Sequence, residues 1–255
     1  MAESYMTAAN LRELRGRVDA EPNAAWADEA VCRRYLRARK GNLDKASAML
    51  RETLQWRREF GVDDLWRENS ATVRRESATG KMRVSPSRDR DGRPTLVMCP
   101  RLENNQKGHE ENLVNLVYHM ERATGGVPLR GGSPLARAPD GKLVVVMDFG
   151  GYSMRNAPPM KTSRATLSIL QDHYPERLHR FLLLRAPYVF HVFFRIISPF
   201  IDPGTRQRIC FVSGSADEQR EILQSSFDLA HLEADLGGEL AHRWDPDAYF
   251  AEEAP

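Results

Sequence analysis

Apolar residues recur at helical spacing in the first part of the chain. Within residues 28–40 and 43–54, apolar side chains return every three or four positions. Gly41 and Gly61 follow these stretches, and glycine commonly ends a helix. Strand-like alternation is absent from this part of the sequence. Residues 1–78 are therefore predicted to form a small helical bundle.

Short apolar runs replace this pattern in the rest of the chain. Residues 81–84 and 95–99 are predicted to form two strands, with a turn at Asp91-Gly92 between them. Continuous apolar runs farther on predict strands that are covered on both faces of a sheet. These runs are 143–147, 181–184 and 209–212, and helices are predicted between them at 162–172 and 188–197. Alternating strands and helices predict an α/β domain with a mainly parallel sheet over residues 79–245.

The predicted helix at residues 188–197 is apolar around almost its whole circumference. His191 and Arg195 are its only strongly polar side chains, and their spacing places both on one face. One interpretation is a crossover helix that is buried on all sides. The other is a lid that covers an apolar cavity with one face and contacts a membrane with the other. The segment is too short to cross a bilayer, which takes about 20 residues.

Composition narrows the classes of protein that the chain can represent. Of 255 residues, 41% are hydrophobic and 28% are charged, as in folded proteins. Lysine and arginine number 37 and aspartate and glutamate 35, a near balance that does not favour nucleic-acid binding. Three widely spaced cysteines suggest neither a disulfide framework nor a zinc site. Because no signal peptide and no membrane-spanning apolar run is visible, we expect a soluble, cytoplasmic protein.

Motifs for catalysis are missing or isolated. Residues 148–150 read Asp-Phe-Gly, as in protein kinases, but the accompanying kinase motifs are absent. The triplet is therefore interpreted as a strand end followed by a turn. No nucleophile elbow, phosphate-binding glycine loop or metal-ligand spacing occurs, so we expect no enzyme activity, no cofactor and no metal. A lipid hydrolase is the enzyme alternative, and the missing elbow argues against it.

Two polar segments lie directly before predicted strands. Residues 173–177 precede the strand at 181–184, and residues 201–208 precede the strand at 209–212. Because the amino ends of parallel strands meet at the same edge of a sheet, these segments are expected to lie near each other. A third segment, residues 33–40, carries five cations, which suit either a solvated helix face or an anionic lipid surface.

The order of several short motifs resembles that of the CRAL-TRIO lipid-binding family, in particular the yeast phosphatidylinositol transfer proteins. The resemblance covers about residues 28–240. Its motifs are Tyr35-Leu-Arg-Ala-Arg-Lys40, Trp56-Arg-Arg-Glu-Phe-Gly61, Asp91-Gly-Arg-Pro94, His173-Tyr-Pro-Glu-Arg177, Ala186-Pro187, Pro199-Phe-Ile-Asp-Pro-Gly-Thr205 and Gly237-Gly-Glu-Leu240. Each motif is weak alone, but their shared order is specific.

The resemblance implies a CRAL-TRIO lipid-binding fold, with a sheet floor, helical walls and an N-terminal helical bundle. The helix at residues 188–197 corresponds to a mobile gate over one hydrophobic cavity. The headgroup-binding residues that the family pattern implies are Arg57, Glu176, Thr205 and Arg208, with Arg208 in place of the usual lysine. The gate and cavity residues that it implies are Tyr188, Phe190, Val192, Phe193, Phe194, Ile197 and Phe200.

The resemblance also implies a function. We expect a monomer that binds phosphatidylinositol and exchanges lipids between membranes through transient contact with the membrane surface. Leu170 occupies a position where choline-lipid-binding members can carry serine, which weakens the case for phosphatidylcholine as a second ligand. Residues 56–61 and 173–177 are more similar to members that pair phosphatidylinositol with another hydrophobic ligand such as a sterol. The alternative is a carrier of a different hydrophobe in the same fold, namely sterol, squalene, tocopherol or retinoid. No nucleic-acid partner is expected.

Overall fold

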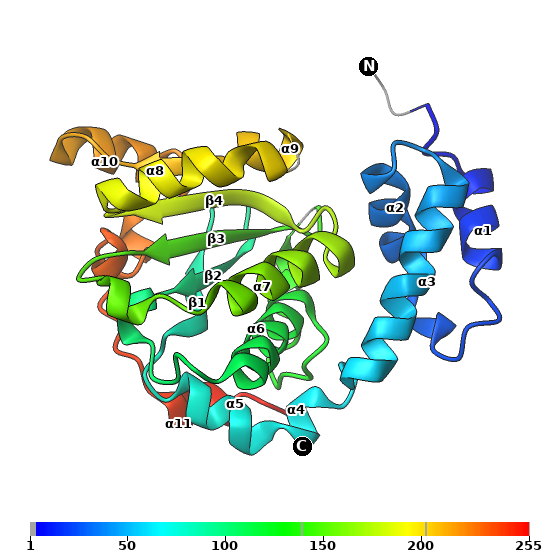
Figure 1. Ribbon diagram of the computed structural model, residues 1–255, viewed down its shortest axis with the longest axis horizontal. Coiled ribbons are helices and arrows are strands. Elements are labelled where there is room, and N and C mark those ends of the chain that lie inside the picture. Colours follow the sequence, from blue (N-terminus) through cyan, green and yellow to red (C-terminus); the bar gives the residue numbers. More distant parts are fainter. Residues whose placement is uncertain (1–3, 139, 202, 255) are drawn as a thin grey trace. The chain divides into compact units, whose positions relative to one another are not determined.

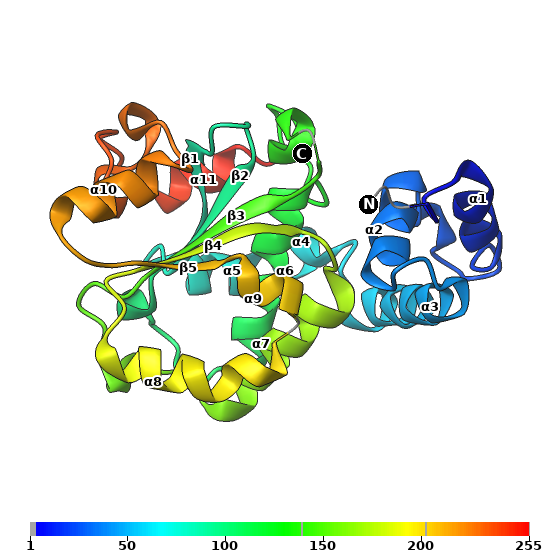
Figure 2. The same cartoon turned by 90° about the horizontal axis from the view of Figure 1, so that it is seen from above.

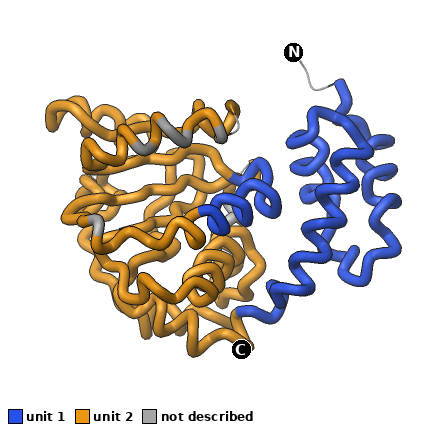
Figure 3. Tube along the Cα trace, in the orientation of Figure 1, with its two compact units in different colours: residues 1–65, 164–177 blue, residues 66–163, 178–255 orange. Residues whose placement is uncertain are grey.

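The computed structural model describes residues 4–138, 140–201 and 203–254 (Figure 1). The chain divides into two compact units (Figure 3). The helical unit comprises residues 1–65 and 164–177, and the sheet unit comprises residues 66–163 and 178–255. A stretch from the middle of the sequence therefore belongs to the helical unit.

The helical unit is built on three helices with side-chain N-caps. They are α1 (Ala8–Gly16), α2 (Glu29–Ala38) and α3 (Leu43–Phe60). Thr7, Asp28 and Asn42 each accept a hydrogen bond from a backbone amide in the first turn of their helix, which stabilises these helix starts. α3 ends at Gly61, whose φ of 70° suits a residue without a side chain. The two helices predicted in this region are confirmed.

The sheet unit contains five strands in the order β1-β2-β3-β4-β5. Their bounds are β1 (Met82–Arg88), β2 (Pro94–Met98), β3 (Leu143–Asp148), β4 (Leu178–Leu184) and β5 (Ile209–Val212). β1 and β2 pair antiparallel, and the hairpin between them includes Gly92 at a φ of 82°. The other neighbours pair parallel, so the mainly parallel sheet is confirmed. β1 is longer than the run at 81–84 predicted.

Helices connect the parallel strands, as the alternating pattern predicts. The connections are α6 (His109–Thr124) after β2, α7 (Met160–His173) after β3, and α8 (Tyr188–Ile197) with α9 (Pro203–Gln207) after β4. α4 (Leu65–Glu68) and α5 (Ser70–Ser77) precede the sheet, and α10 (Ala216–Gln224) and α11 (Pro246–Ala251) follow it. Figure 2 shows α10 on one side of the sheet and α8 on the other.

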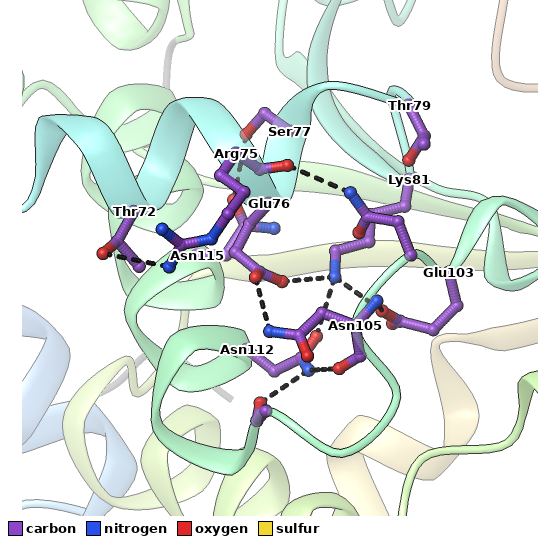
Figure 4. A network of polar contacts seen from close by, with 12 residues as sticks. Thr72, Arg75, Glu76, Ser77, Thr79, Lys81, Glu103, Asn105, Asn112 and Asn115 are labelled. Atoms are coloured by element: carbon purple, nitrogen blue, oxygen red, sulfur yellow. Dashed lines mark hydrogen bonds and ion pairs between the residues drawn. The ribbon is translucent and has the colours of Figure 1, made fainter.

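A buried polar network attaches the first strand to α5 and α6 (Figure 4). The ammonium of Lys81 donates to Glu76 Oε2 at 2.6 Å, to Glu103 Oε1 at 2.7 Å and to Asn112 Oδ1 at 3.0 Å. Asn105 Nδ2 donates to the other carboxylate oxygen of Glu76 at 2.7 Å. The buried charge of Glu76 is therefore balanced and hydrogen-bonded, which burial requires.

Candidate lipid-binding site

The two faces of the sheet differ in how well they are packed. On one face Val97, Val144, Leu182 and Val212 belong to a fully buried cluster. The cluster is completed by side chains from the chain that follows β5, among them Leu223, Phe227, Leu229, Leu232 and Leu236. This face is a solid hydrophobic core.

The opposite face is apolar but only partly covered. Side chains alternate along a strand, and the strand register places Val145, Met147, Phe181, Ile209 and Phe211 on this second face. These five are half-buried, whereas Leu143 and Leu183 on the same face are buried. Val144, Val146 and Leu182 on the first face are also buried. The prediction that these strands are covered on both faces is therefore corrected for these five positions of the second face. An apolar surface left open in this way is typical of a ligand-binding cavity.

α8 lies over the β5 end of this partly covered face. The ring of Phe211 is 4.2 Å from that of His191, 5.4 Å from that of Phe194 and 6.4 Å from that of Phe190, measured between ring centroids. Phe190 also contacts Phe149, at 4.5 Å between centroids. The inner side of α8 is thus aromatic and rests on the sheet.

The outer side of α8 is exposed and mainly apolar, with Arg195 as an exposed charge in its last turn. Tyr188 is 80% exposed, Val189 51% and Val192 38%. Of the predicted gate and cavity residues, Phe190 and Phe194 therefore face inward, whereas Tyr188 and Val192 face solvent. The side chains of Phe193, Ile197 and Phe200 lie outside the described part of the structure.

Two of the predicted headgroup residues come together at the amino end of β5. The amide of Arg208 donates to the carbonyl of Thr205 at 3.0 Å, in the turn that joins α9 to β5. Nη1 of Arg208 donates to the carbonyl of Leu178, the first residue of β4, at 2.5 Å. Both side chains are half-buried. Because Thr205 and Arg208 both belong to the segment at residues 201–208, the expected meeting of this segment with residues 173–177 stays a prediction.

The other two predicted headgroup residues belong to the helical unit. Arg57 on α3 is 3% exposed, pairs with Asp63 at 2.5 Å and stacks its guanidinium over Trp26 at 4.2 Å. Glu176 is half-buried and has a φ of 59°, a value that non-glycine residues seldom adopt and that is commonest at functional sites. The grouping of all four residues in one headgroup site stays a prediction.

The segment that carries Glu176 is anchored within the helical unit. The hydroxyl of Tyr35 donates to Thr53 Oγ1 at 2.9 Å, and Thr53 Oγ1 lies 3.1 Å from Nδ1 of His173. The His173 ring stacks on Trp56 with 4.1 Å between centroids. Burial raises the pKa of Tyr35 to about 12 and lowers the pKa of His173, so both side chains are neutral near pH 7. This contact joins three of the motifs on which the resemblance rests.

Comparison with known proteins identifies the family. Residues 78–238 match the family model described as the CRAL/TRIO domain. The chain belongs to the CRAL/TRIO domain family. A CRAL-TRIO domain-containing protein of Schizosaccharomyces pombe is 33% identical over 88% of this chain and 20% of its own length. The phosphatidylinositol transfer protein PDR17 of Saccharomyces cerevisiae is 30% identical over 88% of this chain and 61% of its own length. The resemblance inferred from the motifs is confirmed, and the chain spans only part of both relatives.

A solved structure supports the same fold. The crystal structure of Sfh5 matches with a TM-score of 0.62, covering 82% of this chain and 79% of that chain at 16% sequence identity. The expected CRAL-TRIO fold is therefore confirmed. Among the described residues, no helix of this CRAL/TRIO chain is both long and apolar enough to cross a membrane.

The sheet side of the CRAL/TRIO site was missed by sequence reasoning. Val145, Met147, Phe181, Ile209 and Phe211 lie in runs whose alternate members are core residues. Because lining and core positions use the same apolar residue types, only their alternation along the predicted strands could have separated the two groups. The sequence identifies His191 as a polar side chain of this helix but does not predict its stacking on Phe211.

Proposed function

We propose that this CRAL/TRIO chain binds phosphatidylinositol in a hydrophobic cavity that α8 closes, and transfers the lipid between membranes. The observation that carries the proposal is the half-buried apolar face of β3, β4 and β5 beneath α8. The similarity to a phosphatidylinositol transfer protein supports the choice of lipid. The chain acts in the cytoplasm as a monomer that contacts membranes transiently, and no covalent step is involved.

A carrier of this kind must replace the apolar surroundings that the lipid has in a bilayer. Exposing one methylene group to water costs about 0.8 kcal/mol, so two acyl chains of roughly 30 methylenes cost on the order of 20 kcal/mol. The apolar side chains of the sheet face and the aromatic side chains of α8 supply surface of the required character. The cavity must offset nearly all of that cost without binding the lipid so tightly that release fails.

The headgroup is held by charge and hydrogen bonding at the edge of the sheet. In this proposal the guanidinium of Arg208 and the hydroxyl of Thr205 bind the lipid phosphate, for which an arginine can offer two parallel donors. The backbone contact between the two residues supports their joint action. The family resemblance implies Glu176 and Arg57 as further headgroup residues, and we propose that they contribute to binding of the inositol and phosphate groups.

The lipid that the chain selects can be measured directly. After incubation with vesicles that contain phosphatidylinositol, phosphatidylcholine and a sterol, native mass spectrometry is expected to show one bound phosphatidylinositol. Replacing Val145 with tryptophan fills space on the sheet face and is expected to reduce lipid loading at least about 10-fold, whereas Val145→Ala keeps it. Circular dichroism checks that both variants fold. A bound sterol in place of the phospholipid would favour the carrier of a different hydrophobe.

The exposed apolar side of α8 is the proposed membrane contact. Replacing both Tyr188 and Val189 with glutamate is expected to weaken binding to neutral phosphatidylcholine vesicles at least about 10-fold, because two exposed apolar side chains can no longer enter the lipid interface. Vesicle co-sedimentation measures the effect. The matched control carries Gln224→Glu and Ala230→Glu, two exposed positions after β5. Equal loss in both double variants would contradict the role of α8.

A further inference from the structure

The connection between β4 and α8 is short and conformationally restrained. β4 ends at Leu184 and α8 begins at Tyr188. Arg185 between them has a φ of 52°, a left-handed conformation that a non-glycine residue adopts only where its surroundings hold it. Pro187 then serves as the N-cap residue of α8, with its ring fixing the backbone. Any swing of α8 away from the sheet must rotate the backbone at these residues.

The side chain of Arg185 is clamped to the end of the neighbouring strand. Its Nε donates to Asp148 Oδ1 at 2.7 Å and its Nη2 lies 2.7 Å from Asp148 Oδ2, a two-pronged ion pair. Nη2 also donates to the carbonyl of Asp235 at 2.7 Å. The carboxylate of Asp148 is 2% exposed, so it is shielded from water, whereas Arg185 is 46% exposed.

The two residues after Asp148 complete this arrangement. Phe149 is buried, its amide donates to the carbonyl of Leu184 at 3.0 Å, and its ring packs on Phe190 of α8. Gly150 donates its amide to Asp148 Oδ1 at 2.8 Å. A Cβ at Gly150 would lie 2.6 Å from Nε of Arg185, so a side chain there would displace the guanidinium.

We propose that Asp148, Phe149 and Gly150 form a latch that holds α8 in its closed position through Arg185. The Asp-Phe-Gly triplet, which the sequence predicts to be a strand end followed by a turn, thereby acquires a role in this chain. The inference rests on the proposed function in one respect, that α8 is the moving element of lipid exchange. Arg185 and Asp148 act as positioning residues, because they contact the backbone hinge of α8 rather than the lipid.

The latch should act on the balance between closed and open states of α8. In this proposal the ion pair forms only while the backbone between β4 and α8 keeps the closed conformation. Losing the ion pair therefore raises the ratio of open to closed molecules by a factor set by its free energy. Because this contact is charge-assisted and uses two hydrogen bonds, its removal is expected to make opening of α8 roughly 10-fold more frequent. The closed state itself survives, because the aromatic contacts of α8 with Phe211 remain.

Hydrogen exchange measured by mass spectrometry tests the latch without any lipid. Arg185→Asn, which tolerates the left-handed backbone, and Asp148→Asn are each expected to speed amide exchange in residues 188–197 roughly 10-fold. The double variant should match the single variants, since all three lack the same contact. Arg185→Lys keeps the positive charge but cannot donate two parallel hydrogen bonds, so it should give an intermediate rate of amide exchange. Lipid release to acceptor vesicles should be fastest for Arg185→Asn and Asp148→Asn, and intermediate for Arg185→Lys.

The control removes an arginine from the other end of β4. Arg180 binds the hydroxyls of Ser225 at 2.8 Å and Ser226 at 2.6 Å, so Arg180→Ala should leave exchange in α8 unchanged. Unchanged exchange in α8 for both Arg185→Asn and Asp148→Asn would overturn the latch. Equal acceleration in β2 and α6 would also overturn it, as general destabilisation. Faster exchange in α8 together with no lipid transfer by the unmodified chain would overturn the proposed function and leave the latch standing.

Discussion

Replacing Arg208 with alanine is expected to reduce phosphatidylinositol transfer by about 10- to 100-fold while the chain stays folded. A charge-assisted hydrogen bond to phosphate contributes about 1.5–3 kcal/mol, which corresponds to that range of affinity. The amide of Arg208 donates to the carbonyl of Thr205 at the amino end of β5, and its guanidinium donates to the carbonyl of Leu178. In the proposed site the variant would lose the phosphate contact, while the apolar face of the sheet would be unchanged.

Transfer of fluorescent phosphatidylinositol between vesicles measures this effect. Arg208→Lys restores a positive charge without the two-pronged geometry and should keep more transfer than Arg208→Ala. Arg206→Ala removes an exposed arginine two positions earlier and should have little effect. Full transfer by a folded Arg208→Ala variant would refute the assignment of Arg208 to the headgroup site.

Replacing Glu233 with glutamine is expected to lower the free energy of unfolding by roughly 3–5 kcal/mol, the cost of leaving one charge of a buried ion pair without its partner. The side chain of Glu233 is 2% exposed and that of Arg83 is 6% exposed, with 2.5 Å between Oε2 and Nη2. Oε1 of Glu233 also accepts a hydrogen bond from Ser85 at 2.5 Å. The variant leaves the guanidinium of Arg83 buried with no carboxylate opposite it.

Urea unfolding followed by circular dichroism gives the free energy of each variant. The matched control is Glu239→Gln, which breaks an ion pair with Arg220 in which both side chains are at least half exposed. Such surface pairs contribute about 0–1 kcal/mol, so the control should unfold nearly as the original chain does. A loss for Glu233→Gln no larger than for Glu239→Gln would show that the buried pair does not stabilise this fold.

The secondary structure could be predicted closely because its causes are local. The helix at 188–197 and the strands at 143–147, 181–184 and 209–212 agree with the observed elements to within a few residues. Apolar spacing, glycine stops and the Asp91-Gly92 turn act over a few positions, so they can be read from the chain directly.

The candidate site was predicted only in part. Thr205 and Arg208 lie close in the sequence, and parallel strand order places their segment beside the start of β4. The clamp between Asp148 and Arg185 joins residues 37 positions apart, and the pair of Arg83 and Glu233 joins residues 150 apart. The sequence does not indicate that these residues pair, because aspartate, glutamate and arginine also form the ordinary ion pairs of an exposed surface.

The sequence by itself determined the order of helices and strands, the parallel sheet and the family to which the chain belongs. Only the tertiary structure decided which apolar residues are core and which line an open face, since Val144 and Val145 are chemically the same. Burial depends on what covers each face of the sheet, and that is set by segments far apart in the chain. For the same reason only the fold could show that Phe190 faces Phe211 while Val189 faces solvent.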